Sequence, residues 1–267
     1  VNRAAPTFLS AFTVNTKTFG DEPFSLLPFT VGLDNTDGTY HFSSSNSLLV
    51  SISGDTATIL AYTPSPITIT VDIDACGNYA ASSTSGTLTV NRGPQTFQAV
   101  SPVIKTFDDA AFSLAPYMVG ISNSSGSYTF ASSNPSAISI GGDGVTATIH
   151  AYTPSAVTIT ESQAAAGNYA AGTKTFLLTV NRGTPTISGL TNLTKTMIDA
   201  PFTLSPTSNS NGTFSYVSDN SAIIFMTNSG TTFNMAGSGL ANITATITQD
   251  TSGNYNTRNY NFTIAVA

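Results

Sequence analysis

Three copies of one sequence unit follow each other along this chain of 267 residues, and this repetition limits the available folds more than any other feature. Each copy begins with the pattern Lys-Thr-x-x-Asp, at residues 17–21, 105–109 and 195–199. Each copy also contains Gly-Asn-Tyr, at residues 77–79, 167–169 and 253–255. The first two copies end in Leu-Thr-Val-Asn-Arg-Gly, at residues 88–93 and 178–183, so the period is about 90 residues. A unit of this length that recurs in tandem predicts small domains in series, each with its own core.

The positions of these motifs predict where the domains begin and end. We expect one repeat over residues 6–93, a second over 94–183 and a third over 184–267. Val1-Asn2-Arg3 matches Val90-Asn91-Arg92, so residues 1–5 are interpreted as the tail of a preceding repeat with its linker. On this hypothesis the chain is a segment of a longer tandem array.

The hydrophobic pattern inside each copy has a period of two residues. Over residues 67–73 every second side chain is Ile or Val, and the residues between them are Thr and Asp. This alternation predicts a half-buried β-strand. Several such runs are separated by Asn-, Asp- and Gly-rich turns, and no stretch has a helical stripe. We therefore expect an all-β chain of three antiparallel β-sandwiches arranged as an elongated array.

The composition excludes several classes of function. Only 8 residues are Lys or Arg and 14 are Asp or Glu, whereas 34 are Ser and 43 are Thr. Eight dispersed cations are too few for nucleic-acid binding, which requires clustered basic residues on the phosphates. The 40% of hydrophobic residues excludes disorder, yet no apolar run is long enough to span a bilayer. We expect no nucleic-acid partner and no membrane insertion by this segment.

The repeat motifs resemble those of bacterial Ig-like tandem repeats. The resemblance lies in the Lys-Thr-Phe-Gly-Asp opening, in Ser-Ser-Asn at 44–46 and 132–134, in Gly-Asn-Tyr towards the end of each unit, and in Gly-Thr-Leu-Thr-Val at 86–90. It is strongest to the MBG-type and group 2-type repeats of very large surface proteins, which are similar to repeats in virion proteins of phages and large DNA viruses. The resemblance implies three Ig-like sandwiches in an extracellular, cell-surface or virion-surface protein. The third copy departs most from the pattern, which suggests a terminal or capping unit.

The resemblance and the scarcity of reactive residues together favour a structural role. We expect a non-enzymatic stalk or spacer, with neighbouring repeats of a longer chain as its partners and no cofactor. One alternative is an adhesin that binds a carbohydrate, another subunit or a surface protein through the loops of one repeat. A second alternative is a set of accessory domains in a secreted hydrolase.

The side chains capable of chemistry are few, and ordinary structural roles explain them. His41 and His150 have no counterparts in the other copies, and no catalytic motif includes them, so we interpret them as surface or packing residues. Cys76 corresponds to Ala166 and Ser252, which indicates a small, half-buried position and no disulfide. We therefore assign no catalytic, cofactor-binding or metal-binding residue.

Two acidic groups raise the question of calcium. The loop Asp34–Gly38 carries two carboxylates and an Asn, and oxygen ligands of this kind suit Ca²⁺. The corresponding acids are absent from the second copy, and Asp72 and Asp74 are also unshared. A hydrogen-bonded turn is the preferred interpretation, and calcium binding stays the alternative.

The recurring Lys17, Lys105 and Lys195 have two interpretations. One is an intramolecular isopeptide bond to Asn91 or Asn181, as in some Gram-positive adhesins. The preferred one is a lysine at a strand edge whose aliphatic stem covers apolar surface.

The Gly-Asn-Tyr motif is interpreted as a corner. We expect a positive φ at Gly, an Asn bonded to its own backbone, and a Tyr ring on the core with its hydroxyl tied to the chain. This arrangement resembles the tyrosine corner of Ig-like folds. Sugar stacking by the Tyr is the alternative.

Two sets of residues are candidates for modification and for binding a partner. Glycosylation sequons occur at five asparagines, of which Asn211 lies in the most exposed-looking turn: Asn123, Asn192, Asn211, Asn242 and Asn261. The third repeat also contains apolar residues without counterparts, which form a candidate partner interface: Ile223, Ile224, Phe225, Met226 and Phe233.

Overall fold

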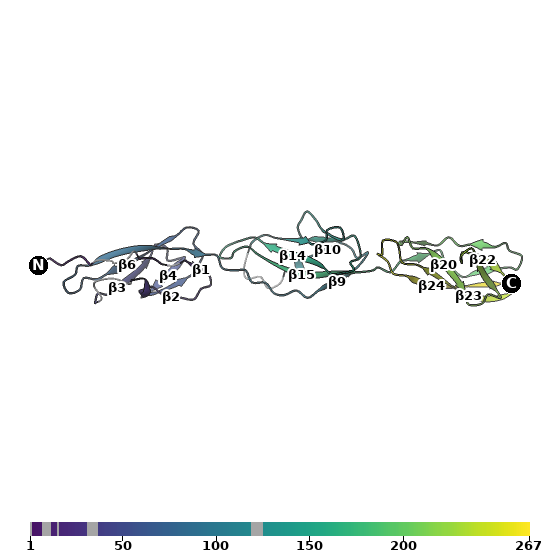
Figure 1. The fold of residues 1–267 in the computed structure, drawn as a ribbon, viewed down its shortest axis with the longest axis horizontal. Helices are drawn as coiled ribbons and strands as arrows, with labels where there is room; N and C mark the ends of the chain where they lie inside the picture. The colour runs from purple at the N-terminus through teal and green to yellow at the C-terminus, as the bar shows by residue number, and fades with distance from the viewer. Residues whose placement is uncertain (1, 7–11, 15, 31–36, 119–124) are drawn as a thin grey trace. The chain divides into compact units, whose positions relative to one another are not determined.

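The computed structural model describes residues 2–6, 12–14, 16–30, 37–118 and 125–267. Within these ranges the chain forms 24 strands and two short 3-10 helices, and no α-helix (Figure 1). This confirms the all-β prediction. The strands fall into three sets, one for each copy of the sequence unit.

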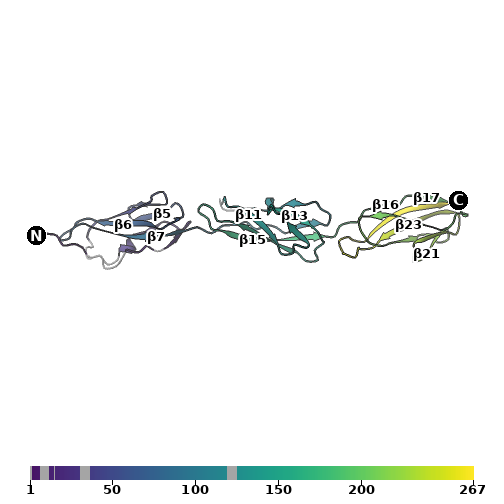
Figure 2. The same ribbon diagram turned by 90° about the horizontal axis from the view of Figure 1, so that it is seen from above.

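The first set forms two three-stranded antiparallel sheets and one parallel pair. The sheet orders are β2-β5-β4 and β3-β6-β7, and β1 pairs with β8 in parallel. Figure 2 shows β6 and β7 side by side. The elements are β1 (Lys17–Thr18), β2 (Phe24–Ser25), η1 (Leu27–Thr30), β3 (Tyr40–Ser44), β4 (Val50–Ser53), β5 (Thr56–Ile59), β6 (Ile67–Ile73), β7 (Ser82–Leu88) and β8 (Val90–Asn91).

The second set repeats this arrangement. The sheet orders are β10-β13-β12 and β11-β14-β15-β9, and β9 runs parallel to β15. The elements are β9 (Val103–Thr106), β10 (Phe112–Ser113), η2 (Ala115–Tyr117), β11 (Tyr128–Ser132), β12 (Ile138–Ile140), β13 (Thr146–Ile149), β14 (Val157–Gln163) and β15 (Gly172–Asn181).

The third set has the same two sheets and one additional pair. The sheet orders are β18-β22-β21 and β17-β24-β23-β20, and β16 pairs with β19. The elements are β16 (Ile187–Ser188), β17 (Leu193–Lys195), β18 (Phe202–Thr203), β19 (Thr207–Ser208), β20 (Phe214–Ser218), β21 (Ile224–Thr227), β22 (Thr232–Met235), β23 (Gly239–Ile247) and β24 (Arg258–Val266).

The strand connections of the third set follow the immunoglobulin plan. One sheet joins β18, β22 and β21, and the other joins β20, β23 and β24, which corresponds to the BED and CFG sheets of an Ig domain. The strand β17 pairs in parallel with the last strand, β24. The first two sets have the same connections, so the chain contains three Ig-like antiparallel sandwiches in tandem.

The burial pattern of β6 confirms the period of two. Ile67, Ile69, Val71 and Ile73 are buried and the residues between them are wholly or partly exposed. β-Branched side chains suit this pleated, half-buried surface, and Thr keeps that preference on the wet face. Alternate residues point to opposite faces of the sheet. In every repeat, one such strand therefore packs one row of side chains in the core and presents the other row to solvent.

Two hydrophobic clusters show that cores are built within single repeats. The first cluster contains residues between Phe12 and Val90, with Leu26, Ile69 and Leu88 fully buried. The second contains residues between Leu190 and Val266 and so belongs to the third repeat.

The described chain divides into two compact units. One comprises Val1–Ala99, Met118–Thr129 and Glu161–Lys174, and the other comprises the remaining residues. The division passes through the second repeat, so the predicted boundaries at 93/94 and 183/184 stay a prediction. The junction between the first and second repeats lies within the first unit, and the junction between the second and third lies within the second unit.

The Lys-Thr-x-x-Asp motif forms a recurring turn. The Asp carboxylate accepts a hydrogen bond from the Thr backbone N–H at 2.9, 2.9 and 2.8 Å in the three copies. In return, the Asp N–H donates to the Thr carbonyl. Gly20 (φ 99°) and Asp108 (φ 77°) occupy the same left-handed position of this turn. The motif is therefore structural in each repeat.

We predict that neighbouring leucines of β15 differ sharply in their contribution to stability. Leu178 is fully buried, whereas Leu177 is 45% exposed. Leu178→Ala should lower the free energy of unfolding by about 2–5 kcal/mol through lost burial and a cavity. Leu177→Ala should change it by less than about 0.5 kcal/mol. Chemical denaturation of both variants tests this, and equal losses would contradict the core assignment.

Candidate functional site: the junctions between repeats

The two histidines lie at the surface, each with one polar neighbour. His41 Nε2 lies 3.0 Å from Asp74 Oδ2, and both side chains are about 60% exposed. His150 Nε2 lies 2.7 Å from the Ser139 hydroxyl. An ion pair this exposed contributes little to stability. Among the described residues no three His, Cys, Asp or Glu side chains gather as metal ligands.

The remaining acidic and thiol candidates are also scattered. Residues 34–36 of the candidate calcium loop lie outside the described residues, and Asp74 is the partner of His41. Cys76 is a half-buried free thiol, as predicted, and its backbone pairs with Tyr79.

The recurring lysines each lie over an aromatic ring. The Nζ atoms of Lys17, Lys105 and Lys195 are 4.2–4.4 Å from the ring centroids of Phe24, Phe112 and Phe202. This geometry is a cation–π contact between each lysine and an aromatic ring of its own repeat. It supports the preferred interpretation of these lysines.

The sequons within the described residues are all exposed. Asn211 lies in the loop between β19 and β20 and bonds weakly with Thr251, and Asn261 lies on β24. Asn242 donates from Nδ2 to Asp219 at 2.7 Å, and Asn192 accepts from the Thr263 N–H at 2.9 Å. Asn123 lies outside the described residues. Glycosylation stays a prediction.

Only part of the candidate partner interface of the third repeat is exposed to solvent, where a partner could bind. Ile224 and Phe233 are fully buried in the core, because alternate residues of β21 and β22 point inward. Ile223 and Met226 are half-buried and also pack against that core. The inclusion of Ile224 and Phe233 was therefore wrong, and Phe225, which is 40% exposed, is the accessible side chain.

Instead, the structure brings recurring residues together where one repeat meets the next. At the first junction the Gly93 N–H donates to the Asn168 carbonyl at 2.9 Å, and the Ala170 N–H donates to the Gly93 carbonyl at 2.8 Å. Gly93 thereby forms a parallel bridge with Tyr169. At the second junction Gly183 makes the same bridge with Tyr255.

A glycine is required in this connector. A Cβ atom on Gly93 would lie 2.4 Å from the Phe19 carbonyl oxygen, well inside contact distance. On Gly183 it would lie 3.0 Å from the Phe107 oxygen. The connector therefore runs directly against the Lys-Thr-Phe turn of the preceding repeat. The glycine of Gly-Asn-Tyr has a positive φ in each copy, as predicted.

The Asn side chain binds across the junction. Asn168 Oδ1 accepts a hydrogen bond from the Tyr62 backbone N–H at 3.0 Å, and Asn254 Oδ1 accepts one from the Tyr152 N–H at 2.9 Å. The expectation that this Asn bonds its own backbone was wrong. The acceptor instead satisfies a partly buried N–H of the preceding repeat.

The Tyr ring also faces the preceding repeat. Tyr169 packs edge-on against Phe19 with centroids 5.6 Å apart, and Tyr255 packs edge-on against Phe107 at 5.2 Å. Edge-to-face pairs of this kind are favourable aromatic contacts. The motif is therefore a docking element between repeats, and its interpretation as a tyrosine corner was wrong.

An arginine forms a further contact across each junction. Arg92 Nε donates to the Gly167 carbonyl at 3.1 Å while its guanidinium lies 4.4 Å from the Tyr62 ring centroid. Arg182 makes the same contacts with Gly253, at 2.8 Å, and with Tyr152, at 4.0 Å. Each guanidinium therefore joins the turn of one repeat to the aromatic ring of the other.

A repeated sequence motif marks these tyrosines. Ala-Tyr-Thr-Pro-Ser occurs at 61–65 and 151–155 and is missing from the third copy, in which Met197 also replaces the phenylalanine of Lys-Thr-Phe. Two features that are lost together are expected to share one role.

The second junction has an additional polar contact. The Tyr255 hydroxyl donates to Asp108 Oδ2 at 2.5 Å, and Asn209 Nδ2 donates to the same oxygen at 3.1 Å. Burial, this hydrogen bond and the charges of Asp108 and Asp250 raise the pKa of Tyr255 to about 12.

Asp250 holds the turn that carries Tyr255. Burial by itself would raise its pKa, but hydrogen bonds from Ser252 and from the backbone N–H groups of Tyr255, Asn254 and Gly253 lower it below the ordinary value. The carboxylate therefore stays charged and fixes the Gly-Asn-Tyr turn of the third repeat.

Comparisons with known proteins give structural similarity only. No protein-family model matches the chain, and the search of curated proteins found no match. A fragment of titin, I67–I69, is 13% identical over 99% of each chain, with a TM-score of 0.34. Drosophila N-cadherin EC1–3 is 10% identical over 96% of this chain and 99% of that chain, with a TM-score of 0.31. Domains 3–5 of Drosophila OTK are 9% identical over the full length of both, with a TM-score of 0.30.

We predict that the junction asparagines stabilise the junctions. Asn168→Ala leaves the Tyr62 N–H without its acceptor, and Asn254→Ala does the same to Tyr152. Each change should cost about 1 kcal/mol of local stability. Amide hydrogen exchange at Tyr62 and Tyr152 should accelerate accordingly. Asn78→Ala is the matched control, because no described residue bonds the Asn78 side chain, and exchange at Tyr62 and Tyr152 should stay unchanged in that variant.

We also predict that the second junction weakens at high pH. The raised pKa of Tyr255 means that its stabilising effect is complete below pH 10 and is lost as the pH rises through about 12. Burial also raises the pKa of Tyr216. Tyrosinate absorbance should show a late-titrating group that disappears in Tyr255→Phe and titrates earlier in Asp108→Asn, while the contribution of Tyr216 stays unchanged in both variants. Tyr169→Phe should retain the late group. Its loss in that variant instead would contradict the assignment.

Proposed function

We propose that the chain is a non-enzymatic spacer whose repeats are held in series by the docking contacts described above. The observation that supports this is the recurrence of one set of contacts at both junctions. In each junction the connector glycine and the arginine of one repeat bind the Gly-Asn-Tyr turn of the next. The Asn side chain and the Tyr ring of that turn bind the preceding repeat in return. A flexible linker between independent domains would not need such a set.

The position of the contacts suits a spacer. The bridges at Gly93 and Gly183 use backbone hydrogen bonds, which do not depend on which side chains cover the repeats. The number of repeats can then change without redesign of the junction, and the span follows the copy number. The two core clusters remain inside the first and the third repeat.

The surface of the chain also fits this role. Few charges and many Ser and Thr residues give a hydrated surface with weak long-range fields. We propose that it acts outside the cell, on a cell or virion surface, with neighbouring repeats as its partners. Among the described residues no helix is long and apolar enough to cross a membrane.

An adhesive contact is a second candidate for the third repeat. Met197, Ile198 and Leu240 are 46%, 95% and 58% exposed. The Met197 N–H donates to the Ala267 carbonyl and Leu240 pairs with Ala265, so the backbone brings these apolar residues to one end of the sheet. Phe225 is a further exposed apolar residue of this repeat. Exposed apolar groups of this kind favour a protein partner.

The spacer proposal predicts that the repeats tumble together. Residual dipolar couplings of the intact chain should fit one alignment tensor across each junction. The double variant Asn168→Ala/Asn254→Ala should separate the tensors because it removes one acceptor from each junction, whereas Asn78→Ala should not. Separate tensors in the unmodified chain would overturn the proposal. A glycan array in which the chain binds strongly would favour the adhesive candidate.

A further inference from the structure

The N-terminal end of the first repeat contains a third copy of the docking element. We define the N-terminal docking surface as Arg3, Ala4, Gly77, Asn78 and Tyr79. The Ala4 N–H donates to the Asn78 carbonyl at 2.8 Å, and the Ala80 N–H donates to the Ala4 carbonyl at 2.8 Å. Ala4 forms a parallel bridge with Tyr79, as Gly93 does with Tyr169 and Gly183 with Tyr255. The connector is therefore bound to this repeat in the same way as at both junctions.

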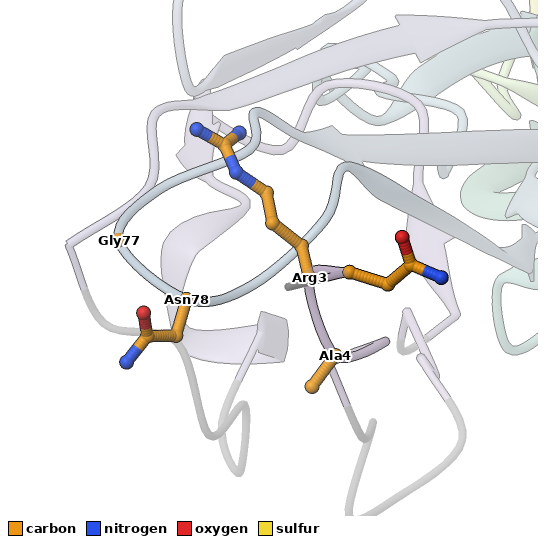
Figure 3. Close-up of a pocket in the computed structure, with 5 residues that line it drawn as sticks. Arg3, Ala4, Gly77 and Asn78 are labelled. Atoms are coloured by element: carbon orange, nitrogen blue, oxygen red, sulfur yellow. The ribbon is translucent and has the colours of Figure 1, made fainter.

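A pocket marks this surface. It is lined by Asn2, Arg3, Ala4, Gly77 and Asn78, which come from the N-terminal segment and from the loop between β6 and β7 (Figure 3). Gly77 has the positive φ of its equivalents, at 55°. Both sides of the connector–loop contact are therefore already in the docked conformation.

The groups that bind a preceding repeat elsewhere have no partner here within the described residues. At the first junction the Asn168 side chain binds the Tyr62 N–H and the Tyr169 ring packs on Phe19. No described residue makes an equivalent contact with the Asn78 side chain or the Tyr79 ring. Arg3 and Asn78 are exposed, and Tyr79 is half-exposed.

We propose that the N-terminal docking surface binds the C-terminal end of another Ig-like repeat connected to it in series, of the type of the first two repeats. This inference rests on the proposed spacer function. The Asn78 Oδ1 accepts the backbone N–H of a tyrosine that corresponds to Tyr62. The Arg3 guanidinium covers that tyrosine ring, and the Tyr79 ring packs edge-on against an aromatic residue that corresponds to Phe19.

A second copy of this chain does not supply that end. The first and second repeats each already bind the next repeat at this end, and in the third repeat Met197 replaces the phenylalanine of Lys-Thr-Phe. The loop between β22 and β23 is shorter than the loop between β5 and β6, and it contains no aromatic residue. The required tyrosine and phenylalanine are thus both missing from the third repeat.

Ala4 distinguishes this surface from the two junctions. Ala4 carries a Cβ methyl group at the position that corresponds to Gly93. At Gly93 an added Cβ would lie 2.4 Å from the Phe19 oxygen. The docked repeat must therefore lie slightly farther from Ala4 than Phe19 lies from Gly93. Ala4→Gly should remove this restraint and strengthen docking.

The test is a longer chain in which an added repeat precedes Asn2. Residues 94–180 are placed before Asn2, so that Val180 takes the place of Val1, and a second version uses residues 6–90. A matched control uses residues 184–266, which lack the tyrosine and the phenylalanine. Protected strand amides in the added repeat confirm in each case that it is folded.

The expected result is protection of one specific amide. In the first two versions the added tyrosine N–H should exchange more slowly than in the same chain carrying Asn78→Ala, by about fivefold. Ala4→Gly should slow it further, and in the control the added repeat should tumble independently. Exchange that does not depend on Asn78 in both versions would overturn the inference.

The same samples separate this inference from the proposed function. The native junctions at Asn168 and Asn254 are present in every version, so their rigidity tests the spacer proposal independently. Rigid native junctions with a freely tumbling added repeat would refute only the N-terminal docking surface. Head-to-tail association of the unmodified chain in sedimentation experiments would identify a second copy as the occupant and also overturn the inference.

Discussion

The parallel backbone bridge between the connector and the Gly-Asn-Tyr turn determines how the other parts of each junction are placed. Once Gly93 is bonded to Asn168 and Ala170, the Asn side chain and the Tyr ring are directed at the preceding repeat. The close approach of the Phe19 carbonyl then leaves no room for a side chain at residue 93 in this docked geometry. A short, hydrogen-bonded connector converts two separately folded sandwiches into one docked pair, and its glycine is a steric requirement rather than a source of freedom.

The junctions rely on contacts that are short in range. Each uses backbone hydrogen bonds, one Asn acceptor, an edge-to-face aromatic pair and one guanidinium over a ring. Salt screens exposed ion pairs but has little effect on such contacts. A chain with 22 charged residues in 267 therefore keeps its junctions without a network of salt bridges. The carboxylate of Asp108 is the exception, and it adds a pH-dependent contact to the second junction alone.

The fold followed from the sequence because its signals are local and repeated. The alternation over residues 67–73 identifies the buried face of β6, and three copies of the same motifs identify three sandwiches. The role of Asn168 could not be found in this way, because its partner Tyr62 is 106 residues away and a local turn satisfies the same motif equally well. The predicted partner interface at residues 223–226 was partly wrong for another reason. Four consecutive apolar residues show no alternation, so the pattern cannot separate buried Ile224 from exposed Phe225.

The differences between the copies carry more information about function than their similarities. Tyr62 and Phe19 have counterparts in Tyr152 and Phe107, and both are missing from the third repeat. That repeat retains the Gly-Asn-Tyr turn that binds the repeat before it, yet it lacks the aromatic groups that would bind one after it. Its sandwich is complete, because the core cluster and both sheets are present. The aromatic groups are therefore dispensable for folding, and their presence in a repeat indicates that its C-terminal end is built to be covered.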